Sequence, residues 1–160
     1  MAPDSLTAEL DYPMVIVTTV SRSGERAGCL VGFHTQCSIK PLRWAVFVSI
    51  ANRTYDVARD AEGLAVHFPS RGDHDMAELF GELTDDEVDK FTRCEWTVGP
   101  LGMPLLSRCP NRFVGRVLHV VDNGGDHVCF VLDRLEVDHP HAVDQLTFQS
   151  VRDLEAGHQP

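Results

Sequence analysis

The chain has no long apolar run. Its 160 residues are 43% hydrophobic, yet no segment approaches the roughly 18 consecutive apolar residues that a membrane-spanning helix needs. The N-terminal stretch M-A-P-D-S-L-T-A-E-L-D also lacks the basic region and apolar run of a secretory signal. We therefore expect no membrane partner. The apolar content suffices for the core of one globular domain over residues 1–160, ordered from about residue 8 to about residue 150.

Positive charge is scarce. Lys and Arg number 14 against 24 Asp and Glu, which gives a formal net charge of −10. A nucleic acid or an anionic membrane surface would repel such a chain, so neither is expected as a partner. Much of the acid lies between Asp73 and Asp89, where we expect a solvated helical face.

Paired cysteines and recognisable ligand clusters are missing too. The five cysteines form no Cys-x-x-Cys pair, and without a signal they are predicted to be reduced thiols of a cytoplasmic protein. We expect Cys29, Cys37 and Cys129 to be small core residues, because their surroundings are apolar. His139-Pro140-His141 has no third ligand in reach, so no metal site is predicted. Walker and Rossmann motifs are also absent.

What the chain does have is a series of β-branched and apolar runs separated by polar turns. Strong turn signals lie at residues 21–26 (S-R-S-G-E-R) and 122–126 (D-N-G-G-D), and each predicts a hairpin. The run at 44–50 is almost wholly apolar, as a strand buried on both faces would be. The predicted strands cover residues 12–20, 27–33, 44–50, 63–68, 112–121 and 127–137.

Between these strands lie shorter helical patterns. Helices are predicted over residues 54–60, 73–80 and 85–92, the last capped by Thr84 with Glu87 three residues on. The Gly- and Pro-rich stretch 97–107 predicts an irregular loop. About six strands with short helical insertions in one small domain favour a mainly β fold, a closed antiparallel barrel, over a parallel α/β sheet.

The stretch from Ala27 to Tyr55 carries the strongest chemical signal. Two extended segments in it each end in polar residues, and the second breaks into Ser49-Ile50-Ala51-Asn52-Arg53-Thr54-Tyr55. Hydroxyls, an amide and a guanidinium at the start of a helix suit an anionic ligand. The same residues also fit a plain helix cap with a surface arginine.

In order and spacing, this stretch resembles the FMN-binding split-barrel flavin reductases. The matching positions are Ala27-Gly28, Val31, Thr35, Ser38, Pro41, Ser49, Thr54 and Tyr55, and the resemblance extends to residues 12–20, 63–68, Asp89-Lys90-Phe91 and Gly125-Asp126-His127. The chain departs from the pattern at Gly32-Phe33-His34, Leu42 and Leu132-Asp133-Arg134. These departures bear on the substrate and the catalytic details more than on the fold.

The resemblance implies a six-stranded antiparallel Greek-key split barrel that forms a homodimer. It also implies an NAD(P)H-dependent flavin reductase that binds FMN, or FAD, and supplies reduced flavin to a monooxygenase. Such reductases fold NADH or NADPH over the flavin, so they need no Rossmann motif. The flavin-binding residues it implies are Leu30, Val31, Gly32, Phe33, His34, Thr35 and Gln36 along the ring and ribityl chain, largely through their backbone, and Ser49, Ile50, Ala51, Asn52, Arg53, Thr54 and Tyr55 around the phosphate.

Two histidines have two readings each. His34 stands where the family carries Phe, and it either contacts the flavin or is a half-buried ring bonded to a carbonyl. His127, in Gly125-Asp126-His127, is the implied catalytic residue beside the nicotinamide, or else a strand-start residue with a polar tip.

Two other functions remain open for this sequence. One is a flavin-binding electron carrier that does not react with nicotinamide. The other is a split-barrel module that binds the deazaflavin F420 or haem.

Overall fold

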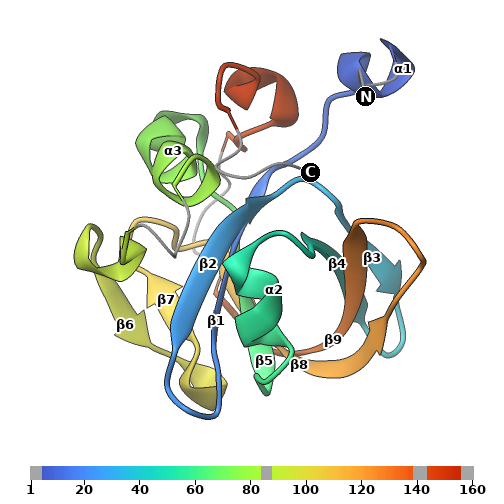
Figure 1. Ribbon diagram of the computed structural model, residues 1–160, viewed down its shortest axis with the longest axis vertical. Helices are drawn as coiled ribbons and strands as arrows, with labels where there is room; N and C mark the ends of the chain where they lie inside the picture. Colours follow the sequence, from blue (N-terminus) through green and yellow to red (C-terminus); the bar gives the residue numbers. More distant parts are fainter. Residues whose placement is uncertain (1–4, 84–87, 139–143, 156–160) are drawn as a thin grey trace.

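The computed structural model describes residues 5–83, 88–138 and 144–155, and its centre is one curled antiparallel sheet (Figure 1). Seven strands lie in the order β2-β1-β5-β8-β9-β4-β3. They are β1 (Val15–Val20), β2 (Arg26–Val31), β3 (His34–Ser38), β4 (Arg43–Ser49), β5 (Gly63–His67), β8 (Arg112–Val121) and β9 (His127–Asp138). The two edge strands, β2 and β3, are consecutive in the chain, so the barrel is split between them.

The strand pairs follow the turn signals of the sequence. β1 and β2 form a hairpin with Val15 opposite Val31, and its turn includes Gly24 at a φ of 93°, a conformation that favours glycine. β8 and β9 form the second hairpin, with Val121 opposite Cys129. β3 and β4 form a third. The predicted mainly β, antiparallel fold is therefore confirmed.

The barrel interior is built from alternating residues of these strands. Val15 and Val17 of β1 face the interior, where they pack in one cluster with Phe130 of β9. Ile16, between the two valines, faces outward and packs under α3 (His74–Gly81). This alternation is the two-residue period of a strand covered on both faces.

Helices and one small sheet cover the outside of the barrel. α2 (Arg53–Ala58) packs on β1 and β2. α3 directly follows η1 (Arg71–Asp73), a short 3-10 helix, and lies along β2. The C-terminal turn η4 (Phe148–Val151) lies next to α3 (Figure 1), and α1 (Ser5–Glu9) is joined to η4 by a hydrogen bond from the Gln149 side-chain amide to the Ala8 carbonyl at 3.1 Å. The described part of the chain contains no helix long and apolar enough to cross a membrane.

Four predictions about local structure were wrong. Residues 97–107 are not an irregular loop, because β6 (Trp96–Val98) pairs with β7 (Pro104–Leu106) around the turn η3 (Pro100–Gly102). The strand count is higher than six, because β3 and this small sheet were missed. The run at 44–50 is not buried throughout, since Trp44 and Phe47 are only half-buried. Cys37 is exposed, whereas Cys29 and Cys129 are buried as predicted.

Only part of the helix predicted at 85–92 falls within the residues that the structure describes. Residues 84–87, including the predicted cap at Thr84, lie outside the described residues, as does His139-Pro140-His141. The described remainder forms a 3-10 turn, η2 (Lys90–Thr92), in which Asp89 accepts a hydrogen bond from the Phe91 N–H at 3.1 Å.

Candidate functional site

A cavity of about 400 Å³ lies where the end of β2 meets α3 and the C-terminal segment. Its volume is within the range of small-molecule sites in proteins. Its lining is mostly apolar and aromatic. The lining residues are Tyr12, Met14, Cys29, Leu30, Val31, Gly32, Phe33, Phe47, Ser49, Asn52, Phe80, Gly81, His127, Phe148, Val151, Leu154 and Glu155.

Aromatic rings from four separate segments form a continuous row along this cavity. Tyr12 stacks on Phe148 with centroids 5.0 Å apart, and Phe33 lies 6.5 Å from Tyr12. His127 continues the row, 5.0 Å from Phe33. Flat walls of this kind suit a planar aromatic ligand.

Gly32 allows two side chains to pack closely against the backbone at one wall of the cavity. A Cβ at this position would lie 2.9 Å from the Tyr12 ring and 3.2 Å from the Met14 sulfur. Both of those residues also line the cavity. A side chain at position 32 would therefore displace the Tyr12 ring or the Met14 side chain from its place at the cavity.

The fold brings seven of the fifteen sequence-predicted residues to this cavity. The residues that line it are Leu30, Val31, Gly32, Phe33, Ser49, Asn52 and His127. They come from the end of β2 and the link that follows it, the end of β4, the N-cap of α2 and the start of β9. β4 and β9 pair with Ser49 opposite His127, so the strand register places the hydroxyl and the imidazole side by side.

His127 is held in one orientation by its neighbour. The Nδ1 atom lies 2.7 Å from the Asp126 carboxylate, and since a carboxylate accepts, Nδ1 carries the hydrogen and Nε2 remains for another partner. This hydrogen bond also lowers the pKa of Asp126. The backbone of Asp126 is fixed in turn, because its carbonyl accepts from the Ile50 N–H at 3.0 Å.

His34 is a half-buried ring bonded to a main-chain carbonyl, the second of the two interpretations given above. Its Nε2 lies 2.7 Å from the carbonyl oxygen of Pro13, and its ring stacks on Trp44 at 5.8 Å. Burial lowers the pKa of His34, so the ring is predominantly neutral near pH 7. Its side chain does not line the cavity, and those of Thr35 and Gln36 are exposed on β3.

The predicted phosphate residues form the N-terminus of α2, and several of their groups are already bonded. Asn52 is the N-cap, and its Oδ1 accepts from the Thr54 N–H at 2.9 Å. The Ser49 hydroxyl accepts from the Ala51 N–H at 3.3 Å. Ile50 and Ala51 are exposed, Thr54 is buried, and Tyr55 packs edge-on against Phe130.

Arg53 points to a carboxylate rather than into the cavity. Its Nε donates to Glu25 Oε1 at 2.9 Å, and its Nη2 donates to the same oxygen. Its Nη1 lies 3.8 Å from Asp56. Glu25 belongs to the turn that precedes β2, so Arg53 ties α2 to the β1–β2 hairpin.

Sequence reasoning missed the walls supplied by α3 and by the C-terminal segment. Tyr12, Phe80, Phe148 and Glu155 carry no local motif, and Glu155 lies beyond the ordered core predicted to end at about residue 150. The aromatic residues Tyr12 and Phe148 were the available signal, but nothing in their spacing links them.

A buried lysine stands behind the wall formed by α3 and β2. The side chain of Lys90 is 1% exposed. Its Nζ donates to the Gly28 carbonyl of β2 at 2.7 Å and to the Phe80 carbonyl of α3 at 3.3 Å. Since Phe80 and the residue after Gly28 line the cavity, Lys90 fixes the spacing of two of its walls.

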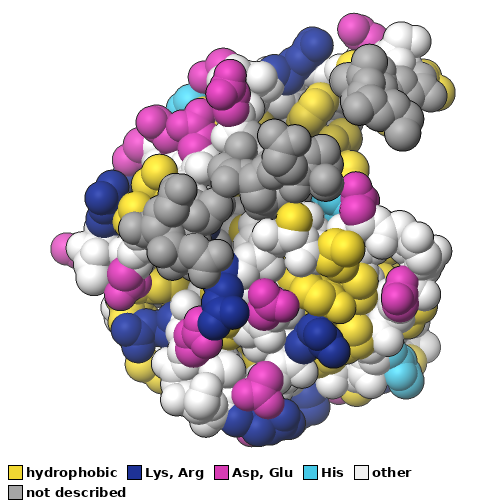
Figure 2. All heavy atoms as spheres, in the orientation of Figure 1, with side chains coloured by type: hydrophobic (Ala, Val, Ile, Leu, Met, Phe, Trp, Pro, Cys, Tyr) yellow, Lys and Arg dark blue, Asp and Glu magenta, His cyan; other side chains and the backbone are white. Residues whose placement is uncertain are grey.

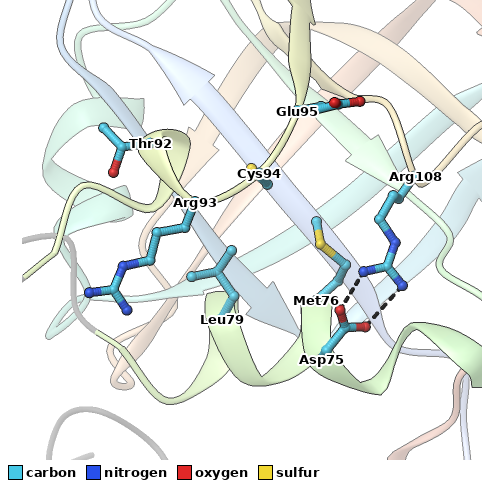
Figure 3. A pocket seen from close by; sticks show the side chains of 8 residues that line it. All are labelled: Asp75, Met76, Leu79, Thr92, Arg93, Cys94, Glu95 and Arg108. Atoms are coloured by element: carbon cyan, nitrogen blue, oxygen red, sulfur yellow. Dashed lines mark hydrogen bonds and ion pairs between the residues drawn. The ribbon is translucent and has the colours of Figure 1, made fainter.

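A larger, open groove of about 590 Å³ lies on the other side of α3 (Figure 3). Met76, Leu79 and Cys94 contribute its apolar part. Arg108 and Asp75 form an ion pair at one end, which lowers the pKa of Asp75. The charged pair at that end is engaged internally, and no residue of the predicted site lines this groove, so the aromatic cavity is the better candidate.

Comparisons with known proteins agree on one family. The family model described as flavin reductase like domain matches residues 7–154. The stachydrine N-demethylase reductase subunit of Rhizobium meliloti is 25% identical over 118 residues, which cover 74% of this chain and 50% of that protein. The ferric-chelate reductase (NAD(P)H) of Archaeoglobus fulgidus is 22% identical over 153 residues, 95% of this chain and 90% of that protein.

A solved structure shows the same fold. The NADH:FAD oxidoreductase of Streptomyces globisporus superposes with a TM-score of 0.79 at 22% identity, over 92% of this chain and 86% of that one. At this identity the likeness establishes the fold alone. The chain spans only half the length of the Rhizobium relative.

Proposed function

Because the chain belongs to the flavin reductase-like domain family, we propose that it is an NAD(P)H-dependent flavin reductase whose flavin, FMN or FAD, binds in the aromatic cavity. The observation that carries the proposal is the convergence at that cavity. Seven residues predicted for flavin binding or catalysis, from separate parts of the chain, line one space with a row of aromatic rings.

The flavin ring fits the residues present. Gly32 lets the Tyr12 ring and the Met14 sulfur pack against the backbone where a Cβ would clash, and the row from Phe148 to His127 offers flat apolar walls for an aromatic ring system. The backbone of residues 30–36 would run along the ring and ribityl chain, with His34, Thr35 and Gln36 contributing main-chain groups only. Flavin supplies hydride acceptance from nicotinamide when it is bound.

The phosphate of the flavin would lie at the α2 end of the cavity. Ser49 and Asn52 line that end, and Arg53 follows directly in the chain, with Ile50, Ala51, Thr54 and Tyr55 completing the segment. For Arg53 to bind the phosphate, its guanidinium must leave Glu25. That exchange costs little, because an exposed ion pair contributes only about 0–1 kcal/mol.

His127 would position the nicotinamide. Its Nδ1 is held by Asp126, so Nε2 is the atom left to bond a carboxamide or phosphate group. The chain's part in the reaction is then to orient two flat rings and to exclude water from between them. Hydride transfer depends steeply on that orientation.

An absorption spectrum of the purified protein, followed by anaerobic titration with NADH and NADPH, tests the proposal. Flavin bands that bleach with a nicotinamide support it. Flavin bands that persist would instead identify an electron carrier without nicotinamide activity. A deazaflavin or Soret band would identify a binder of F420 or haem.

The same proposal includes a homodimer. Large apolar side chains of β8, β9 and the end of β4 are exposed, namely Ile50, Leu118, Val120, Val121 and Leu135. Figure 2 shows hydrophobic side chains gathered on the face between α2 and β9. A second copy would cover such a surface. A stable monomer in sedimentation at micromolar concentration would exclude the dimer.

We further propose that the reductase works in the cytoplasm and hands reduced flavin to a monooxygenase. All five cysteines are free thiols, as in a reducing compartment. One relative is named as the reductase subunit of a demethylase. Co-purification with an oxygenase, or stimulation of an oxygenase by this protein and NADH, tests the partnership.

A further inference from the structure

One end of the aromatic cavity is acidic. Among the described residues that line the cavity, Glu155 is the only Asp, Glu, Lys or Arg. Its backbone N–H donates to the Glu82 carboxylate at 3.2 Å, so a second carboxylate stands directly beside it. Both lie where the C-terminal segment meets the end of α3, and Figure 2 shows further acidic side chains over α3.

No lysine or arginine balances these carboxylates in the described lining. The residues outside the described ranges, 1–4, 84–87, 139–143 and 156–160, contain neither Lys nor Arg in the sequence. Three cations stand close to lining residues, and the side chain of none of them lines the cavity. Arg152 lies on the same segment as Glu155, and its Nη1 donates to the Gln149 side-chain oxygen at 2.8 Å. Arg53 binds Glu25, and Lys90 donates to two main-chain carbonyls behind the wall.

The two ends of the cavity therefore differ in charge. The α2 end has Arg53 next to it and suits the phosphate of a flavin. The opposite end has Glu155 and Glu82, so a second ligand whose charged part leaves the cavity there meets two carboxylates. NADH and NADPH differ only in the 2′-phosphate, which adds close to two negative charges and is bound by arginine in proteins that select NADPH.

On the basis of the flavin reductase function proposed above, we propose that this cavity selects NADH over NADPH and that Glu155 is a specificity-determining residue. The selection arises from electrostatic repulsion of NADPH. Glu155 and Glu82 disfavour the 2′-phosphate, and the net charge of −10 adds a long-range component. Repulsion between exposed charges is screened by salt, so the preference should narrow as ionic strength rises.

Calorimetric binding of NAD⁺ and NADP⁺ to the full-length protein tests the inference without relying on turnover. Wild type should bind NAD⁺ about tenfold more tightly at low salt, as expected for a dianion near two carboxylates in solvent. Glu155→Gln should narrow this ratio by roughly three- to fivefold, through tighter NADP⁺ binding. Raising the salt concentration should reduce the wild-type preference for NAD⁺ over NADP⁺.

Asp153→Asn is the matched control. Asp153 lies two residues away and is exposed, but its carboxylate pairs with His74 at 3.2 Å and does not line the cavity. This variant removes the same charge from the same segment and should leave the ratio unchanged. An equal change in both variants would show a general charge effect and overturn the role of Glu155.

The failure of this inference can be told apart from a failure of the proposed function. If NADP⁺ binds as tightly as NAD⁺, or if Glu155→Gln leaves the ratio unchanged, the inference fails while reduction of flavin by either donor still supports the reductase. If neither nucleotide binds and neither bleaches the flavin, both fail.

Discussion

The rings of Phe33 and His127 lie 5.0 Å apart at the edge of the aromatic cavity, tilted by 59°. Phe33 belongs to the link between the two edge strands of the split barrel, and its carbonyl accepts from the Phe47 N–H at 2.9 Å. His127 begins β9, on the strand that pairs with β4. The link between the two edge strands is thus joined to β9 by a ring contact on one wall of the cavity.

Replacing His127 by Ala should slow flavin reduction. The reason is that the nicotinamide loses the group that positions it, while the flavin keeps its other walls. We expect a loss of ten- to a hundredfold in the reduction rate, at about 1.4 kcal/mol per factor of ten, with FMN affinity within about threefold of wild type. Stopped-flow bleaching of bound flavin measures the rate.

His119→Ala is the control for this variant, because His119 is exposed on β8 and does not line the cavity. It should reduce flavin at the wild-type rate. If His127→Ala also reduces flavin at that rate and loses only thermal stability, His127 is a structural residue.

Replacing Arg53 by Ala should weaken FMN binding far more than riboflavin binding. A charge-assisted hydrogen bond to the phosphate contributes about 1.5–3 kcal/mol, so a loss of roughly tenfold or more is expected for FMN alone. Glu25→Gln should act in the opposite direction, because it removes the carboxylate that now holds the guanidinium. Fluorescence titration with both flavins provides the measurement.

Arg22→Ala is the matched control, since Arg22 pairs with Asp60 at 3.6 Å on the surface and should affect neither flavin. Equal losses for FMN and riboflavin in Arg53→Ala would place the phosphate elsewhere.

The sequence predicted most of the barrel but only part of the cavity. The strands at 63–68, 112–121 and 127–137 were predictable because each shows a strand pattern bounded by turn residues. β3 was missed because His34-Thr35-Gln36-Cys37-Ser38 is polar, as an edge strand paired on one side only can be.

The missing walls of the cavity have a different cause. Phe148 contacts Tyr12, and Lys90 contacts Gly28, although each pair is far apart in the chain. The direction in which a side chain points could not be predicted from the sequence either. Arg53 stands at the predicted helix start, but only the fold shows that Glu25 lies within its reach.

Replacing Lys90 by Met should destabilise the protein and loosen the cavity. Methionine has a similar length but cannot donate to the carbonyls of Gly28 and Phe80. Leaving a buried acceptor without its partner costs about 1–3 kcal/mol. Urea denaturation measures the free energy of unfolding, and flavin titration well below the midpoint measures the cavity.

Met103→Ala is a suitable comparison, because Met103 is fully buried in a separate cluster and does not line the cavity. It should lower stability without weakening flavin binding. Unchanged urea midpoint and flavin affinity in Lys90→Met would show that Lys90 does not hold the two walls.

His67 should make the protein less stable in mild acid. Its ring is completely buried, with Nδ1 donating to the Ile16 carbonyl at 3.0 Å and Nε2 accepting from the Leu106 N–H at 3.0 Å. The bond that Nε2 accepts requires the neutral ring, and burial lowers the pKa of His67 from 6.5 to about 4. The unfolded chain therefore takes up a proton at a higher pH than the folded protein does.

The stability that His67 contributes is present above about pH 6.5 and is lost as the pH falls toward 4, at about 1.4 kcal/mol per pH unit and about 3 kcal/mol in total. His67→Gln removes the titration but keeps one donor and one acceptor, so its free energy of unfolding should fall less steeply between pH 7 and pH 5. The pKa of His34 is lowered too and acts with the same sign, but it is common to both proteins. Urea denaturation at several pH values isolates the difference. Parallel curves for wild type and His67→Gln would mean that the His67 ring is protonated in the folded protein, against the hydrogen bond it accepts from Leu106.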